Sequence, residues 1–217
     1  MNEDIANYIN EVRRDFSGKP LNESSVDKEP LNQFSSWFEE AVNSQILDPY
    51  AMSLTTVNSE GQPSTRIVYM RDINDDGFIF YTNYNSSKGK DLASNNKVAL
   101  NFFWGELERQ IRIEGVVEKV EKQVSDNYFA KRPRESQIGA WASSQSETLE
   151  DRLALEGNVK FYTDKFEGID IPRPDHWGGY IVKPKKIEFW QGRSSRLHDR
   201  IIYSKDGSDW CKSRLSP

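Results

Sequence analysis

From residue 52 to its end, the chain alternates short segments rich in β-branched and aromatic residues with clusters of turn-forming residues. The clusters NSEGQP and DINDDG separate the first three segments, and DGSD separates the last two. Gly, Asn, Asp and Pro supply the backbone angles of tight turns, so this punctuation is typical of hairpins. The predicted strands cover residues 52–57, 65–71, 78–82, 98–104, 109–120, 176–182, 186–190, 197–204 and 210–215.

Helical patterns precede the strands and are inserted among them. Leu31, Phe34, Phe38, Ala41 and Val42 follow helical spacing, which predicts an amphipathic helix over residues 31–46. Further helices are predicted over residues 2–16, 87–94, 123–131 and, after Pro133, 147–166. Strands in meander order with helices beside them predict an α+β domain, an antiparallel β-barrel with flanking helices. We expect residues 1–30 to form a flexible N-terminal segment or lid and residues 31–217 to form a single domain.

Charge and composition argue against several classes of protein. Lys and Arg number 29 against 34 Asp and Glu, a net charge of −5, and the two signs are spread along the chain. This balance provides no basic patch that would attract nucleic acid or an anionic membrane. No apolar run approaches the length of a spanning helix, and the N-terminus is polar. One cysteine, Cys211, and two histidines argue against a disulfide or a metal site. We therefore expect a cytoplasmic protein that binds neither nucleic acid, membrane nor metal.

An anion site in this chain would depend on side chains, because it lacks both GxGxxG after a strand and GxxxxGKS/T. Arginine, lysine and hydroxyl groups are the alternative ligands for phosphate. Four candidate cations stand on or beside apolar strands or open a helix: Arg66, Arg71, Lys88 and Arg112.

The run RLHDR offers a second group of cations. On a strand, Arg196, His198 and Arg200 would share one face. Two guanidinium groups beside an imidazole suit an anionic aromatic ligand. A solvated strand face with an ion pair to Asp199 explains the same pattern, and both interpretations stay open.

Tyr128, Arg132 and Ser136 are spaced four residues apart. A continuous helix would align them on one side, although Pro133 is expected to start a new helix. A phenol, a guanidinium and a hydroxyl at one point would form a phosphate clamp, whereas the alternative is an ordinary polar helix end.

Other polar and aromatic residues have structural explanations as well. Ser146 either caps the following helix or binds a ligand together with Gln145. Tryptophans pack in cores more often than they support cofactors, so we interpret four of them as core residues: Trp104, Trp141, Trp177 and Trp190. Cys211 is interpreted as a buried or half-exposed residue without a role.

Five runs, taken together, favour the functional interpretation of these residues over the structural one: IEFWQGRSSRLHDR, RPRESQIGAWASSQS, TRIVYMR, FYTN and LERQIRIEG. They resemble the pyridoxamine 5′-phosphate oxidase family, and the resemblance extends from about Val12 to the end of the chain. The stretch EFWQ, four variable positions and RLHDR is its most specific part.

The resemblance implies an FMN-binding split β-barrel that forms a homodimer, with each active site at the subunit interface. It implies that Arg196 and His198 are catalytic. The positions that match FMN ligands are Arg66, Ile67, Val68, Tyr69, Arg71, Tyr81, Thr82, Ser87, Lys88, Gln110, Gln145, Ser146, Trp190 and Arg200. The positions that match substrate ligands are Arg13, Arg14, Phe16, Arg71, Tyr128, Arg132, Ser136, Arg196, Leu197 and His198.

The implied reaction is the oxidation of pyridoxamine or pyridoxine 5′-phosphate to pyridoxal 5′-phosphate. A hydride passes from C4′ to flavin N5, and O2 reoxidises the flavin to give hydrogen peroxide. Three positions depart from the family pattern: Arg71 replaces a lysine, Ser87 an arginine and Phe16 a tyrosine. A split-barrel reductase and a non-catalytic flavin or pyridoxal phosphate binder are the alternative functions.

Overall fold

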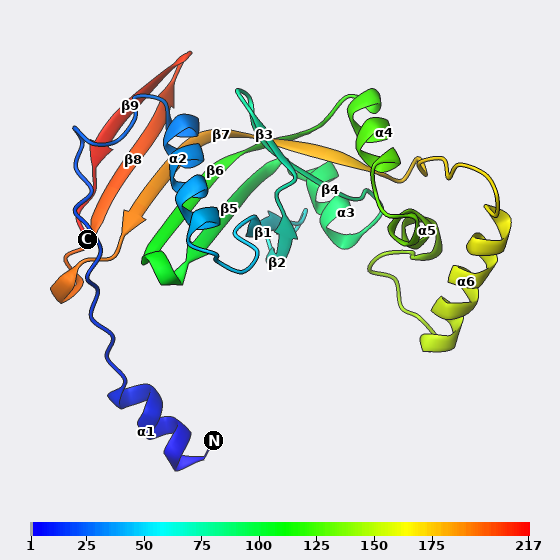
Figure 1. Cartoon of the computed structure of the whole chain (residues 1–217), viewed down its shortest axis with the longest axis horizontal. Helices are drawn as coiled ribbons and strands as arrows, with labels where there is room; N and C mark the ends of the chain where they lie inside the picture. The colour runs from blue at the N-terminus through cyan, green and yellow to red at the C-terminus, as the bar shows by residue number, and fades with distance from the viewer. Residues whose placement is uncertain (1) are drawn as a thin grey trace. The chain divides into compact units, whose positions relative to one another are not determined.

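The computed structural model describes residues 2–217, and the chain divides into two compact units. The central unit comprises Tyr50–Phe102 and Ile113–Lys186. The terminal unit comprises residues 2–49, Phe103–Arg112 and Ile187–Pro217. Three strands contain residues of both units: β5 (Lys97–Trp104), β6 (Arg109–Lys119) and β7 (Trp177–Gln191) (Figure 1).

The central unit is built on a sheet in the strand order β2-β1-β5-β6-β7-β4-β3. Its other strands are β1 (Ala51–Val57), β2 (Pro63–Tyr69), β3 (Asp72–Asn74) and β4 (Gly77–Asn83). The pairings β1–β2, β1–β5, β3–β4 and β4–β7 are antiparallel. Leu54 lies opposite Arg66 on one side and Leu100 on the other. Strand β2 stands at one end of the strand order, so it is an edge strand.

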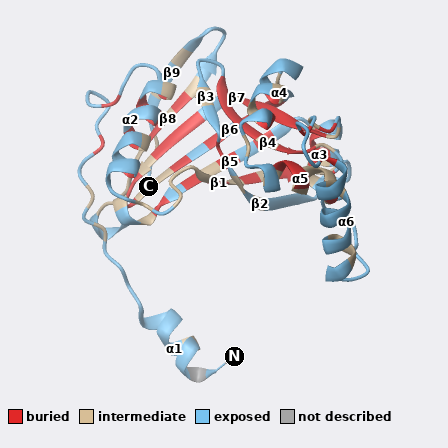
Figure 2. Cartoon of the chain, turned by 45° about the vertical axis from the view of Figure 1, so that its right-hand side comes forward, coloured by how far each residue is buried: buried red, intermediate tan, exposed pale blue. Residues whose placement is uncertain are grey.

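Period-2 alternation in the sequence corresponds to one buried face of this sheet. Met52, Leu54 and Thr56 are buried in β1 while their neighbours are only half-buried. Strand β4 is buried along most of its length, as Figure 2 shows in red. The predicted strands 176–182 and 186–190 form one strand, β7. The correction has a simple reason: Pro184 removes one ladder donor but its fixed φ is compatible with extended backbone.

Four helices belong to the central unit: α3 (Ser87–Ser94), α4 (Lys122–Ala130), α5 (Arg134–Ala142) and α6 (Arg152–Lys165). The prediction of one helix over 147–166 is wrong at its start. Ser146 has φ +75°, and the side chain of Asp151, not of Ser146, caps α6 by accepting a hydrogen bond from the Ala154 amide.

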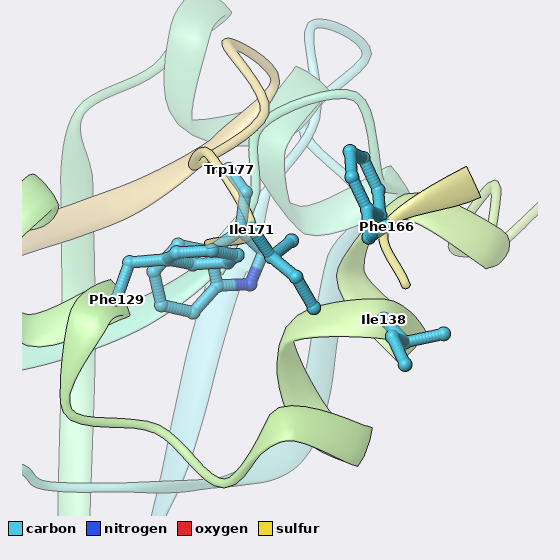
Figure 3. Packing of buried hydrophobic residues seen from close by; sticks show 5 residues of the cluster. All are labelled: Phe129, Ile138, Phe166, Ile171 and Trp177. Carbon is cyan, nitrogen blue, oxygen red and sulfur yellow. The ribbon is translucent and has the colours of Figure 1, made fainter. Parts of the chain in front are cut away.

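A buried cluster joins α4, α5, the segment between α6 and β7, and the first residue of β7. It consists of Phe129, Ile138, Phe166, Ile171 and Trp177 (Figure 3). Tyr81, Tyr128 and Trp141 pack against it while staying partly exposed. This cluster fixes the ends of α4 and α5, which contribute to the site described below.

The terminal unit contains α1 (Glu3–Glu11), α2 (Pro30–Asn43), β8 (Asp199–Asp206) and β9 (Asp209–Arg214). Strands β8 and β9 form an antiparallel hairpin, and β8 also pairs with β7. Phe34, Trp37, Trp104, Phe189 and Tyr203 are buried in this unit. Trp37 meets Phe189 edge to face at 5.2 Å.

Both N-terminal helices are shorter than predicted. The helix predicted over 2–16 ends at Glu11, and the backbone of residues 12–29 forms neither helix nor strand. The helix predicted over 31–46 ends at Asn43, and Gln45 has φ +55°, which a helix does not tolerate.

Cys211 is exposed rather than buried or half-exposed. Within residues 2–217, no helix combines the length and apolar character needed to cross a membrane.

Candidate functional site

A cavity of about 910 Å³ opens in the central unit between β2, β4, the start of α3 and the turn between α4 and α5. The predicted ligand residues that line it are Arg66, Ile67, Val68, Tyr69, Arg71, Tyr81, Thr82, Lys88, Tyr128, Arg132, Ser136 and Gln145. The lining residues that sequence reasoning did not select as ligands are Asn83, Lys131, Pro133, Gly139, Ala140, Ser143 and Trp177. None of the described residues that line it is acidic. The cavity is therefore suited to anions.

Arg66 and Lys88 form one cationic end of the cavity. The Arg66 Nη1 donates to the Thr56 Oγ1 at 2.7 Å, and its Nη2 lies 4.0 Å from the Asp91 carboxylate. The Lys88 Nζ donates to the Gln145 Oε1 at 3.0 Å and to the Thr82 Oγ1 at 3.2 Å.

Burial lowers the pKa of both groups. The charge of Arg66 lowers the pKa of Lys88 further, while Asp91 partly offsets the effect on Arg66. Because Arg66 and Lys88 are both partly buried, they repel each other, and a bound anion would reduce this repulsion.

Arg71 and Arg132 form a second cationic pair. The Arg71 guanidinium lies over the rings of Tyr69 at 4.9 Å and Tyr50 at 5.4 Å. The Arg132 guanidinium lies 4.5 Å from the ring centre of Trp177, and its Nη1 is buried without a hydrogen-bond partner among the described residues. Burial lowers the pKa of Arg132, and the charge of Arg71 contributes to this.

The predicted clamp residues all line the cavity, but they do not stand on one helix. Tyr128 lies near the end of α4, Arg132 in the turn and Ser136 in α5. Pro133 immediately precedes α5. The Gln137 Nε2 donates to the carbonyls of Phe129 and Ala130, so it ties the end of α4 to the start of α5. The three residues line one cavity although they lie on different elements, because a tight turn brings α4 and α5 together.

Two predicted cofactor residues of the central unit do not line the cavity. Ser87 is the first residue of α3 and directly precedes Lys88. Ser146 is exposed and directly follows Gln145. Lys88 and Gln145 line the cavity, whereas Ser87 and Ser146 do not.

The remaining predicted site residues belong to the terminal unit. The prediction that Arg196, His198 and Arg200 share one strand face is wrong, because β8 begins only at Asp199. Ser194–Arg196 form a 3₁₀ turn in which Ser195 and Arg196 have φ of +55° and +60°. Two successive left-handed residues without glycine store backbone strain, a feature that concentrates at functional sites.

His198 and Phe16 pack together in this unit. The His198 ring lies 4.6 Å from the Trp190 ring and meets the Phe16 ring edge to face at 5.2 Å. The His198 Nδ1 accepts a hydrogen bond from the Arg193 amide at 3.1 Å, and Asp15 accepts one from the Ser195 amide. The N-terminal segment predicted as a lid thus contacts the RLHDR region.

The expected ion pair of Asp199 is formed by other partners. Its carboxylate lies 2.7 Å from the Arg214 Nη1 and 3.5 Å from the Arg193 Nε. Arg196 is exposed, and its side chain makes no hydrogen bond or ion pair with the residues that the structure describes. It is therefore free to meet a ligand.

Arg200 is held by a buried carboxylate that sequence reasoning missed. Glu188 accepts from the Arg200 Nε at 2.8 Å and Nη2 at 3.1 Å, and from the Arg112 Nη1 at 3.2 Å. The Glu188 side chain is 8% exposed. Its signal in the sequence was a lone glutamate in the apolar strand IEFW.

Glu188→Gln should lower the free energy of unfolding by about 2 kcal/mol, because two guanidinium groups lose a buried counter-charge. The figure is below that of a fully buried pair, since Arg112 and Arg200 are partly exposed. In a thermal melt this is a loss of about 4–8 °C. The control is Glu114→Gln, which removes an exposed pair with Lys186. Equal melting temperatures for the two variants would refute the structural role of Glu188.

Comparison with known proteins identifies the family. Residues 38–164 match the family described as pyridoxamine 5′-phosphate oxidase, and residues 177–217 match the pyridoxine 5′-phosphate oxidase C-terminal dimerisation region. Proteins named pyridoxine/pyridoxamine 5′-phosphate oxidase from Nostoc punctiforme and Leptospira interrogans are each 50% identical over 210 residues, 96% of this chain and 98% of theirs.

Solved structures agree with this match. The crystal structure of PhzG from Burkholderia lata, in complex with tetrahydrophenazine-1-carboxylic acid, has a TM-score of 0.87 at 32% identity and covers 93% of this chain and 100% of its own. A pyridoxamine 5′-phosphate oxidase-related, FMN-binding protein of Nostoc punctiforme has a TM-score of 0.71 at 13% identity, over 88% of this chain and 100% of its own. The predicted fold, an antiparallel split β-barrel with flanking helices, is confirmed. The chain belongs to the pyridoxamine 5′-phosphate oxidase family.

Proposed function

We propose that this protein is an FMN-dependent oxidase that converts pyridoxamine 5′-phosphate or pyridoxine 5′-phosphate to pyridoxal 5′-phosphate. The observation that carries the proposal is that four of the five Arg and Lys residues described in the cavity lining form two pairs, Arg66 with Lys88 and Arg71 with Arg132. Two phosphate esters, one on the cofactor and one on the substrate, require two such sites. Relatives at 48–50% identity carry the corresponding name.

The Arg66 end fits the FMN phosphate. The partly buried cations Arg66 and Lys88 are held by neutral or distant acceptors, so their charge is largely uncompensated. The edge strand β2 offers backbone groups and exposed Ile67 and Tyr69 to a flat ring system. When bound, FMN would accept a hydride from the substrate and pass its electrons to O2.

The Arg132 end fits the substrate phosphate. The unpartnered Nη1 of Arg132 leaves a buried donor that a phosphate oxygen would satisfy. Tyr128 and Ser136 add hydroxyl groups to the same wall. These residues hold the phosphate, which restricts the position of the pyridine ring.

The terminal-unit residues receive the remaining roles. We assign Arg196 and Leu197 to the pyridine ring, His198 to the proton on the C4′ substituent or to the orientation of Arg196, and Arg200, Gln110 and Trp190 to the flavin. Arg13, Arg14 and Phe16 are assigned to the segment that covers the substrate. The match to a dimerisation region at residues 177–217 supports a homodimer, and the cytoplasm is the expected compartment.

The test is an aerobic assay of the FMN-reconstituted protein with both phosphate esters. We expect a yellow protein that forms the aldehyde and hydrogen peroxide, and ammonia from the amine only. Pyridoxamine without its phosphate is the control and should react far more slowly, because it cannot use the Arg71 and Arg132 pair. A protein that binds FMN but forms no aldehyde would contradict the proposal. Oxidation of a nicotinamide donor instead would support the reductase alternative.

A further inference from the structure

Arg132 is held differently from Arg66 and Lys88. Arg66 and Lys88 donate hydrogen bonds to Thr56, Thr82 and Gln145. The Arg132 side chain, by contrast, makes no hydrogen bond or ion pair with any residue that the structure describes, and its Nη1 is buried. Aromatic rings are its contacts: Trp177 at 4.5 Å and Phe129 at 5.8 Å.

Trp177 is a rigid support for this guanidinium. Its side chain belongs to the buried cluster drawn in Figure 3, and its ring meets the Phe129 ring at 5.3 Å. The ring is nearly parallel to Tyr81 at 5.5 Å and 9°, and to Tyr128 at 6.2 Å and 8°.

The backbone of Trp177 is anchored as well. Its amide donates to the Pro174 carbonyl at 3.0 Å, and its carbonyl accepts from the Arg173 Nη1. Neither the ring nor the backbone can move without disturbing packed neighbours.

We propose that Trp177 is a positioning residue that holds the Arg132 guanidinium by a cation–π contact and leaves its N–H donors for the substrate phosphate. This inference rests on the proposed function. A carboxylate in the place of Trp177 would also orient the arginine, but it would neutralise the charge and compete with phosphate for the same donors. A ring face attracts the cation without occupying a donor.

The test measures binding and turnover separately in Trp177→Leu. We expect the Kd for pyridoxal 5′-phosphate, measured by calorimetry on the FMN-loaded protein, to rise about tenfold, within the range of a desolvated cation–π contact. KM for both phosphate esters should rise in parallel, while kcat and the flavin absorption spectrum stay close to wild type. Trp177→Phe retains a ring face and should recover most of the affinity.

A double-mutant cycle separates positioning from general packing. If Trp177 acts through Arg132, then Trp177→Leu should add little to the loss of affinity in an Arg132→Ala background. Trp141→Leu is the matched control: Trp141 packs against Tyr162 and Phe166 in the same unit but does not line the cavity. It should leave the Kd unchanged.

The outcomes are distinguishable. An unchanged Kd in folded Trp177→Leu, or an equal loss with and without Arg132, would overturn the inference while leaving the proposed function intact. Absence of turnover in the wild-type protein would instead refute the proposed function. If leucine prevents folding, Trp177→Met provides a longer and more flexible apolar side chain and allows the same comparison in the same cycle.

Discussion

Replacing Arg196 by methionine should lower kcat by about a hundredfold while FMN stays bound. Misplacing a reacting carbon by about 1 Å has an effect of this order. Arg196 is exposed, has no partner among the described residues and lies in a strained turn with φ +60°. Methionine keeps much of the side-chain stem and removes the guanidinium. The measurement is kcat and kcat/KM at saturating FMN, with the flavin spectrum recorded on the same samples.

Arg200→Met is the control for this prediction. Arg200 is bound by Glu188 through two hydrogen bonds and donates to the Ser216 carbonyl at 2.8 Å. We assign it to the flavin, so this variant should lose FMN first and recover turnover when FMN is in excess. If Arg196→Met lost flavin and then turned over normally after reloading, the assignment of Arg196 to the substrate would be wrong.

Arg132→Ala should raise KM for both phosphate esters by about ten- to a hundredfold with a smaller change in kcat. A charge-assisted hydrogen bond to phosphate contributes about 1.5–3 kcal/mol of binding, which corresponds to this range. Because the lost interaction contributes to substrate binding in the ground state, its removal should raise KM. Initial-rate kinetics at saturating FMN measure it.

The substrate without phosphate is the internal control for Arg132→Ala. Its KM should be the same in the variant and the wild type, because it presents no anion to the Arg71 and Arg132 pair. An unchanged KM for the phosphate esters would show that the phosphate binds elsewhere, and the Arg66 and Lys88 pair would then be examined by the same substitutions.

Much of the fold was predictable because its information is local. The helix over residues 87–94 was predicted with the bounds of α3, where the Ser86 hydroxyl accepts a hydrogen bond from the Gly89 amide. Strand β1 was predicted within one residue, since its buried and half-buried residues alternate. The errors occurred where longer-range contacts override a local pattern. The helix predicted over residues 147–166 begins only at Arg152, where Asp151 caps it, and Arg196 lies in a 3₁₀ turn rather than on a strand.

The candidate site divides in the same way. Spacing predicted that Tyr128, Arg132 and Ser136 belong together, and the cavity contains all three. Spacing could not show that Trp177 supports Arg132, because 45 positions separate them in the chain and their contact depends on the packing of β7 against α4. Tryptophan in a sequence indicates burial, and only its surroundings indicate a role.

The sequence by itself determined the family, the α+β class and the cationic residues of the cavity other than Lys131, because motifs, periodicity and turn chemistry are properties of neighbouring residues. The tertiary structure alone decided which cations line the same cavity and which carboxylate holds Arg200. It also decided that Arg132 is oriented by ring faces rather than by hydrogen bonds. These properties depend on burial and on contacts between distant segments, and burial is what gives an unpaired charge its energetic weight.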